Sequence, residues 1–247
     1  MLRSVRTARA TLRSLRIYYG DRKRAEAMDR LHGGFVGSGD LVFDIGAHVG
    51  DRVASFRRLG ARVVAIEPQR AMLRVLRMLY GRDRAVTIEA VAVGRQPGRA
   101  RMLINADNPT VSSVSSAFVA AADGAPGWET QHWGEFADVE ITTLDALIAR
   151  HGVPAFIKID VEGFEAEALC GLSQAVRALS FEFTTIQPDV ALACIERCAA
   201  MGYARFNAAL GESQAMIGEW VGVNEITRWL SGLPQAANSG DIYAMAG

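Results

Sequence analysis

The sequence predicts an α/β fold in which a mostly parallel sheet is covered by helices on both faces. Two observations predict it. Short apolar runs alternate with stretches of helical periodicity from residue 41 onward. Runs such as 41–43 and 155–157 are apolar at every position, which is typical of parallel strands that helices bury from both sides. We therefore expect a doubly wound sheet with right-handed crossovers.

Seven strands are expected in this sheet. Five belong to the regular alternation, at 41–45, 62–66, 86–91, 155–159 and 179–183. The helices between them are expected at 49–59, 69–80, 164–172 and 190–201. Two further strands, at 203–208 and 241–245, flank a helical stretch around 219–230, where Trp220 and Trp229 are interpreted as packing residues.

The first 34 residues are expected to form a basic amphipathic helical extension before a domain at 35–247. Its apolar positions recur every three or four residues, at Leu2, Val5, Ala8, Leu12, Leu15 and Tyr19. Nine basic and three acidic residues fall within 1–30. The favoured interpretation is a helix that packs on the domain with its arginines in water. The alternative is peripheral contact with an anionic membrane surface.

Residues 105–138 interrupt the alternation of strands and helices. The segment contains Pro109, several serines, and the tryptophans Trp128 and Trp133. Long insertions in compact domains are often substrate-covering lids or disordered segments. Two tryptophans within six residues favour a lid-like insertion over disorder.

Composition excludes several classes of protein. With 247 residues, 27 basic against 27 acidic side chains and half of the residues hydrophobic, the chain is expected to be globular rather than disordered or fibrous. No apolar run reaches 18 residues, so no transmembrane segment is expected. The three cysteines form no CxxC pair or Cys/His cluster, which favours reduced thiols, no structural zinc and a cytoplasmic location.

An acidic residue and a glycine-rich turn end the first expected strand. Gly46 and Gly50 would let the backbone approach a ligand and the next helix pack closely. A dinucleotide fingerprint would have glycine in place of Ala47, and the carboxylate of Asp44 would repel a pyrophosphate. That carboxylate suits a ligand with a cationic amino-acid end, such as S-adenosylmethionine (SAM).

A second acid, Glu67, ends the second strand and is followed by Pro68. A carboxylate can accept hydrogen bonds from both hydroxyls of a ribose. Glu67 and Asp44 could each instead cap the helix that follows, but their order and spacing together favour an adenosyl ligand. Glu89 and Ala90, at the end of the third strand, complete the candidate cofactor-binding residues.

A third motif lies on the fourth strand of the alternation. Lys158 falls inside a strand that is expected to be buried, so it needs an acidic partner, for which Glu182 is the expected residue. Asp160 lies at the tip of the strand, where it would face the methyl group and the acceptor. An ion pair of purely structural importance is the alternative interpretation.

These motifs resemble the FkbM-type methyltransferases of the Rossmann-like, SAM-dependent class. The resemblance rests on the turn that begins Asp44-Ile45-Gly46, on Glu67-Pro68, and above all on the run Lys-Ile-Asp-Val-Glu-Gly-Phe-Glu at 158–165. It covers about 35–247 and implies a class I methyltransferase fold and methyl transfer from SAM. The implied acceptor is a hydroxyl of a natural product, a sugar or a glycan, with no nucleic-acid partner. His48 stands where the family commonly has Asn.

A hydroxyl acceptor requires a general base. The candidates are His48, His132, Asp160, Glu162 and Glu182, and Asp160 with Lys158 beside it is favoured. Asp160 and Glu162 are suitable ligands for a divalent cation, but two carboxylates are an incomplete ligand set, so no metal site is predicted.

Two other classes of protein stay open, a nicotinamide-dependent oxidoreductase and a non-catalytic SAM-binding scaffold. The remaining histidines, His32 and His151, stand beside glycine and are interpreted as solvated loop residues.

Overall fold

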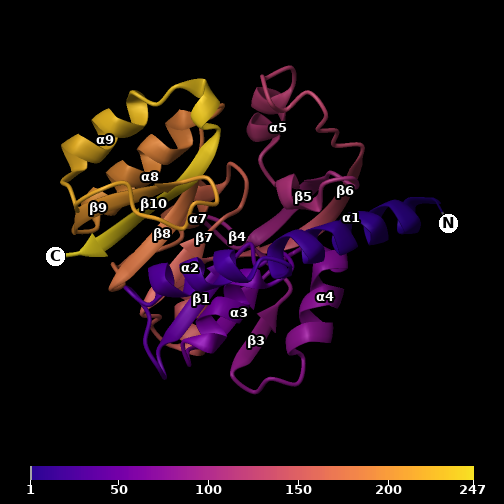
Figure 1. Cartoon of the computed structure of the whole chain (residues 1–247), viewed down its shortest axis with the longest axis horizontal. Helices are drawn as coiled ribbons and strands as arrows, with labels where there is room; N and C mark the ends of the chain where they lie inside the picture. The colour runs from indigo at the N-terminus through magenta and orange to yellow at the C-terminus, as the bar shows by residue number, and fades with distance from the viewer. Residues whose placement is uncertain (1) are drawn as a thin grey trace.

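A seven-stranded sheet forms the centre of the molecule (Figure 1). The structure is a computed structural model that describes residues 2–247, with side chains from residue 9 onward. The strand order is β3-β2-β1-β7-β8-β10-β9. The strands are β1 (Leu41–Ile45), β2 (Arg62–Ile66), β3 (Val86–Glu89), β7 (Phe156–Ile159), β8 (Ala178–Thr184), β9 (Tyr203–Leu210) and β10 (Ser239–Ala246). All strand pairs in this sheet are parallel except the two that β10 makes with β8 and β9, so the predicted fold class is confirmed.

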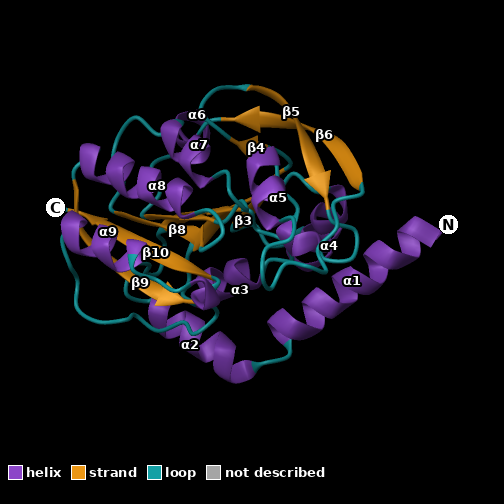
Figure 2. Cartoon of the chain, turned by 90° about the horizontal axis from the view of Figure 1, so that it is seen from above, coloured by secondary structure: helices purple, strands orange, loops and turns teal. Residues whose placement is uncertain are grey.

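Helices cover both faces of this sheet (Figure 2). One face packs against α2 (Arg22–His32), α3 (Asp51–Arg58) and α4 (Arg70–Tyr80). The other packs against α6 (Leu144–His151), α7 (Glu165–Cys170), α8 (Pro188–Ala200) and α9 (Val223–Ser231). Side chains alternate between the faces along each strand, so Phe156 lies on the α3 face and Ile157 on the α8 face. Lys158 therefore shares the α3 face with Phe156.

The N-terminal helix, α1 (Leu2–Tyr19), packs on the domain through its second half. Leu15 and Tyr18 contact the cluster of Val49, Met72 and Val75. This supports the packing interpretation for that half, although Leu12 on the same helix is 65% exposed. The predicted apolar positions Leu2, Val5 and Ala8 lie outside the side chains that the structure describes. Among the described residues, no helix has the length and hydropathy needed to cross a bilayer.

A second, three-stranded sheet was not predicted. It consists of β4 (Ala92–Val93), β5 (Gly98–Ile104) and β6 (Glu135–Thr142), in the order β4-β6-β5. The strand expected at 86–91 ends earlier, because the chain leaves the main sheet after Glu89 to form β4. Strand β6 exposes alternate residues to solvent, so it lacks the continuous apolar run by which the other strands were recognised.

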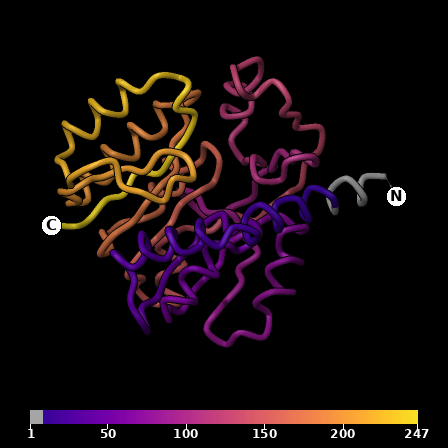
Figure 3. The backbone as a smooth tube through the Cα atoms, viewed as in Figure 1, coloured from indigo at the N-terminus to yellow at the C-terminus, as the bar shows by residue number. Residues whose placement is uncertain are grey.

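The insertion at 105–138 is folded and projects from the main sheet (Figure 3). It contains the 3-10 turn η1 (Pro109–Val111), α5 (Ser116–Ala122) and the beginning of β6. The buried residues Val111, Phe118, Ala122 and Trp128 form its own small core. The tryptophans of this segment therefore have packing partners, as the sequence suggested.

The solvated positions expected for two histidines are wrong. His32 is buried, stacks on Phe56 at 4.3 Å between ring centroids, and places Nδ1 2.9 Å from Oγ of Ser55. It is buried because α2, which lies within the helical extension expected at 1–34, continues through this position. His151 is the last residue of α6, and its Nε2 lies 2.8 Å from Oε1 of Glu89.

Both late tryptophans pack as expected. Trp229 meets the ring of Phe183 edge-on at 5.8 Å, and Trp220 meets Phe35 edge-on at 6.0 Å, measured between ring centroids. Each ring therefore has an aromatic partner within the two main cores.

Candidate active site

A cavity of about 810 Å³, including the open space at its mouth, lies at the carboxyl ends of β1, β2 and β7. This is the edge of an open α/β sheet where ligands bind. Seven of the candidate residues named from the sequence line it, namely Gly46, His48, Glu67, Pro68, Asp160, Glu162 and Glu182. The other walls come from α1, through Tyr18, and from the insertion, through Thr110 and Ser112.

The glycine turn after β1 is shaped by its neighbours. Gly46 has φ +84°, and a Cβ there would lie 1.8 Å from the carbonyl oxygen of Asp160. The sequence suggested that Gly46 lets a ligand approach the backbone. The structure shows that the adjacent end of β7 also requires a glycine here. A Cβ on Gly50 would lie 2.7 Å from the ring of Tyr80, which is the close helix packing expected there. Ala47 is buried against the α3 face.

Asp44 is fully buried, and neither of its carboxylate oxygens has a hydrogen-bond partner among the described residues. Burial raises its pKa to about 7, although Arg52 and Lys158 act in the opposite direction. A buried carboxylate without donors is costly. Asp44 is not among the residues that line the cavity.

Glu67 connects the ends of two strands. Its Oε2 accepts a hydrogen bond from the backbone N–H of His48 at 2.9 Å, and its Oε1 accepts one from that of Gln69 at 2.7 Å. Burial raises its pKa to about 7, against the effect of these two bonds. Glu67 therefore orders the turn after β1 and also lines the cavity.

An ion-pair network fixes Asp160. Lys158 Nζ lies 2.7 Å from Oδ1 of Asp241 and 3.2 Å from Oδ2 of Asp160. The prediction that Glu182 pairs with Lys158 is therefore wrong, because antiparallel β10 brings Asp241 to the ammonium group. Arg52 Nη2 lies 3.1 Å from the same Oδ2 of Asp160. Burial alone would raise the pKa of Asp160, but Lys158 and Arg52 outweigh it and lower that pKa.

His48 lies between α1 and the insertion. Its ring meets that of Tyr18 edge-on at 5.7 Å between centroids, and its Nε2 lies 3.5 Å from Oγ1 of Thr110. Burial lowers its pKa to about 4, although Asp51 and Asp160 act to raise it. The imidazole is therefore neutral near pH 7.

The structure keeps some of the predicted residues away from the cavity. Glu89 accepts hydrogen bonds from Arg150 at 2.9 Å and pairs with His151, while Ala90 lines a separate surface hollow. Lys158 is 1% exposed and lies behind Asp160. His132 is exposed on the insertion.

Several cavity residues were missed from the sequence. Arg52, Tyr18, Thr110 and Glu212 line the wall, and Glu212 pairs with Arg24 at 2.6 Å. Arg52 carried a signal, because the first turn of a helix disfavours a cation and a buried arginine there needs acidic neighbours. The other three depend on contacts between segments far apart in the chain.

The wall of the cavity is strongly acidic. Among the described residues that line it, the carboxylates belong to Glu67, Asp160, Glu162, Glu182 and Glu212. Arg52 supplies the single Lys or Arg charge in that set. Such a wall attracts cationic ligands and disfavours anionic ones such as a dinucleotide pyrophosphate.

Comparisons with known proteins agree with this geometry. The sequence pattern of the methyltransferase FkbM domain matches residues 44–238. No curated protein matches the chain in sequence.

Solved structures that are similar to this chain include three proteins with low sequence identity. Precorrin-6Y C5,15-methyltransferase from Geobacter metallireducens is 14% identical, with 91% of this chain and 87% of that chain covered and a TM-score of 0.43. The 1,6-didemethyltoxoflavin-N1-methyltransferase from Burkholderia thailandensis, with bound S-adenosylhomocysteine, is 12% identical, with 99% and 87% covered and a TM-score of 0.45. Aeropyrum pernix fibrillarin, in complex with SAM, is 11% identical, with 85% and 68% covered and a TM-score of 0.45. Because the family pattern spans most of its length, the chain belongs to the FkbM family of SAM-dependent methyltransferases.

Proposed function

We propose that the protein transfers the methyl group of SAM to a hydroxyl oxygen of a natural product, a sugar or a glycan. The observation that carries the proposal is the acidic cavity at the carboxyl ends of β1, β2 and β7. SAM enters as a sulfonium cation and leaves as the neutral thioether S-adenosylhomocysteine. An acidic wall therefore favours the donor over the product.

The donor site is built from the ends of β1 and β2. Glu67 would accept the ribose hydroxyls, since its carboxylate lines the cavity and is held by two backbone N–H groups. The turn at Gly46 and the buried charge of Asp44 would lie toward the amino-acid end, with Pro68 beside the ribose. The proposed site does not include Glu89 and Ala90, which lie outside the cavity.

Methyl transfer breaks the S–CH3 bond of the donor and forms an O–CH3 bond on the acceptor, whose hydroxyl proton passes to a base. Alignment of donor and acceptor is the main contribution of the protein. His48 is the favoured base, because its neutral imidazole lines the cavity. Asp160 is a weaker candidate, since Lys158 and Arg52 stabilise its ionised form. Its fixed negative charge instead suits the sulfonium, with Lys158 as a positioning residue.

The insertion and the N-terminal extension complete this proposal. The insertion at 105–138 acts as a cover on the acceptor side, which is supported by two contacts with the cavity rim. Ser113 Oγ donates to the carbonyl oxygen of Glu162 at 2.5 Å, and Gln69 Nε2 donates to that of Pro109 at 3.1 Å. The extension at 1–34 closes another side through Tyr18 of α1.

Calorimetric titration with S-adenosylhomocysteine, with NADH as the control, tests the donor site without the acceptor. Binding of S-adenosylhomocysteine alone is expected, and binding of NADH alone would favour an oxidoreductase. Transfer of a labelled methyl group is then measured on a panel of hydroxylated metabolites and glycans. The position of the methyl group in the product, determined by NMR, separates O-methylation from transfer to nitrogen or carbon, which would overturn the proposed acceptor class.

A further inference from the structure

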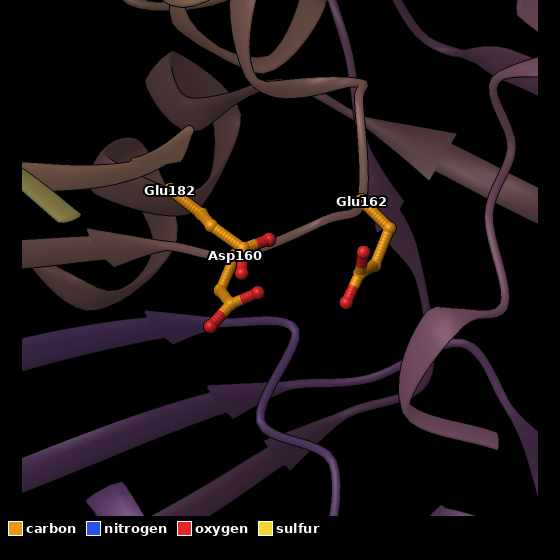
Figure 4. A group of neighbouring side chains, drawn as sticks. All are labelled: Asp160, Glu162 and Glu182. Atoms are coloured by element: carbon orange, nitrogen blue, oxygen red, sulfur yellow. The ribbon is translucent and has the colours of Figure 1, made fainter. Parts of the chain in front are cut away.

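Three carboxylates converge inside the cavity. Asp160 follows β7, Glu162 lies two residues further along the chain, and Glu182 comes from β8. One oxygen from each lies within 4.8 Å of the other two. Figure 4 shows Asp160 and Glu182 on one side of an open space and Glu162 on the other. Carboxylate oxygens arranged in this way are the ligands that hard divalent cations prefer.

The chain supplies positive partners to only part of this cluster. Both Lys158 and Arg52 contact Oδ2 of Asp160, which leaves Oδ1 of that residue without a cation. Glu162 is only 6% exposed, and no described residue donates a hydrogen bond to its carboxylate. Oε2 of Glu182 is buried and also lacks a partner among the described residues. Buried oxygens without donors are costly, so these groups require a ligand or protonation.

Protonation is the alternative, since burial raises the pKa of Glu162 and that of Glu182 well above the ordinary value of a glutamate. A proton shared between Glu182 and Asp160 would join those two carboxyl groups. It would leave Glu162 without a partner, since that carboxylate lies across the open space in Figure 4. A cation placed between the three side chains would serve all of them at once.

We propose that Asp160, Glu162 and Glu182 bind one divalent cation, Mg²⁺ or Mn²⁺, inside the cavity. Three carboxylates leave coordination positions for water and for an oxygen of the acceptor, as is usual for Mg²⁺. A cation there would lower the pKa of a bound hydroxyl and so assist its deprotonation. This catalytic use rests on the proposed function, whereas cation binding itself does not.

The sequence alone pointed to two of the three proposed ligands as a pair. Asp160 and Glu162 are neighbours in the chain, and the pair alone is an incomplete site. The third ligand, Glu182, is added because β8 pairs in parallel with β7, with Ile159 opposite Phe181. Each acid then follows a paired position, so both extend from the same edge of the sheet.

Cation binding is tested by electron paramagnetic resonance of Mn²⁺ with the full chain, because the signal of free Mn²⁺ decreases on binding. One site per chain is expected, with competition by Mg²⁺. Glu162→Gln and Glu182→Gln should each weaken Mn²⁺ binding at least tenfold. The matched control is Glu167→Gln, a surface residue of α7 that pairs with Arg95, and its affinity should equal that of the wild type.

Two results would overturn the proposal. One is an unchanged free Mn²⁺ signal in the wild-type protein at millimolar Mn²⁺, and the other is wild-type affinity in both cluster variants. Circular dichroism of each variant verifies the fold. The readout is independent of methyl transfer, so Mn²⁺ binding without binding of S-adenosylhomocysteine would contradict the proposed function and leave the cation site standing.

Discussion

The ammonium nitrogen of Lys158 lies 2.7 Å from Oδ1 of Asp241, so β7 and β10 are connected across the intervening strand β8. Lys158 is the largest charged side chain among the fully buried residues that the structure describes, with 1% of its surface exposed. Burial would lower its pKa, but Asp160 and Asp241 outweigh this effect and raise it. The lysine is therefore a permanent cation that holds Asp160 at the rim of the cavity.

Asp241→Asn should destabilise the protein. The substitution removes the closest partner of Lys158 and leaves a buried cation with Asp160 alone. The loss of one partner of a buried ion pair lowers the free energy of unfolding by about 3 kcal/mol. Urea denaturation of both proteins at pH 7.5 measures the difference. The control Glu167→Gln removes an exposed pair with Arg95 and should leave the midpoint unchanged. Equal midpoints for Asp241→Asn and the wild type would show that the pair is not a source of stability.

Gly46→Ala should also destabilise the protein. The loss should be larger than that caused by Gly124→Ala, a substitution at another glycine with positive φ. Both Gly46 and Gly124 have positive φ, at +84° and +72°. An added Cβ meets nothing within 4 Å at Gly124, but at Gly46 it collides with the carbonyl oxygen of Asp160. We expect a loss of about 1 kcal/mol for Gly124→Ala, from backbone strain alone. Gly46→Ala should lose about 3 kcal/mol or more, since the end of β7 must move. Equal losses in urea denaturation would remove the close approach as the reason for this glycine.

His32 should make stability depend on pH. Burial lowers its pKa to about 3, far below the value of 6.5 in an unfolded chain. Between these two values the unfolded state binds a proton that the folded state does not, so the free energy of unfolding falls as the pH falls from 6.5 toward 3. From pH 7.5 to 5 this contribution is about 2 kcal/mol.

The test compares the wild type with His32→Gln, because other groups titrate in the same range. The raised pKa values of Asp44, Glu67 and Glu165, each about 7, act in the opposite direction there. They cancel in the comparison. Urea denaturation at pH 7.5 and at pH 5 should show the wild type losing about 2 kcal/mol more than the variant. The same loss in both proteins would mean that His32 is protonated in the folded state.

The sequence was sufficient for the main sheet because its strands are buried on both faces. Strands β1 and β2 were predicted at their observed bounds, since their apolar runs are continuous. The three-stranded sheet was missed, because β5 and β6 are half-exposed and carry charged residues such as Arg99 and Glu140. Periodicity cannot assign such strands without knowledge of their partners.

The sequence also predicted the part of the candidate site that lies at the ends of the predicted strands. Residues at the ends of the predicted strands, such as Glu67 and Asp160, line the cavity as the rule for α/β sheets requires. The partner of Lys158 was wrong because Asp241 is 83 residues away in the chain and reaches it only through the antiparallel insertion of β10. Pairing over that distance leaves no local signal in the sequence.

Asp44→Asn and Glu67→Gln should each weaken binding of S-adenosylhomocysteine at least tenfold, or about 1.4 kcal/mol. Asp44 is a buried carboxylate without donors, and Glu67 lines the cavity. Calorimetric titration measures both affinities. The control Glu140→Gln changes an exposed acid of β6 that pairs with Arg99, and it should bind as the wild type does. Wild-type affinity in both site variants would refute the proposed donor site.

His48→Asn should lower the rate of methyl transfer about 100-fold, because the base that accepts the proton of the hydroxyl is lost. The affinity for S-adenosylhomocysteine should stay within about twofold, since the backbone N–H of residue 48 still donates to Glu67. The neutral form of His48 exists only above its pKa, which burial lowers to about 4. The wild-type rate should therefore fall as the pH drops toward 4, and the variant should lack this decrease. His132→Asn tests the competing histidine, which is exposed on the insertion. A loss of rate in His132→Asn together with a normal rate in His48→Asn would place the base on the insertion, which would then have to close over the acceptor during each turnover.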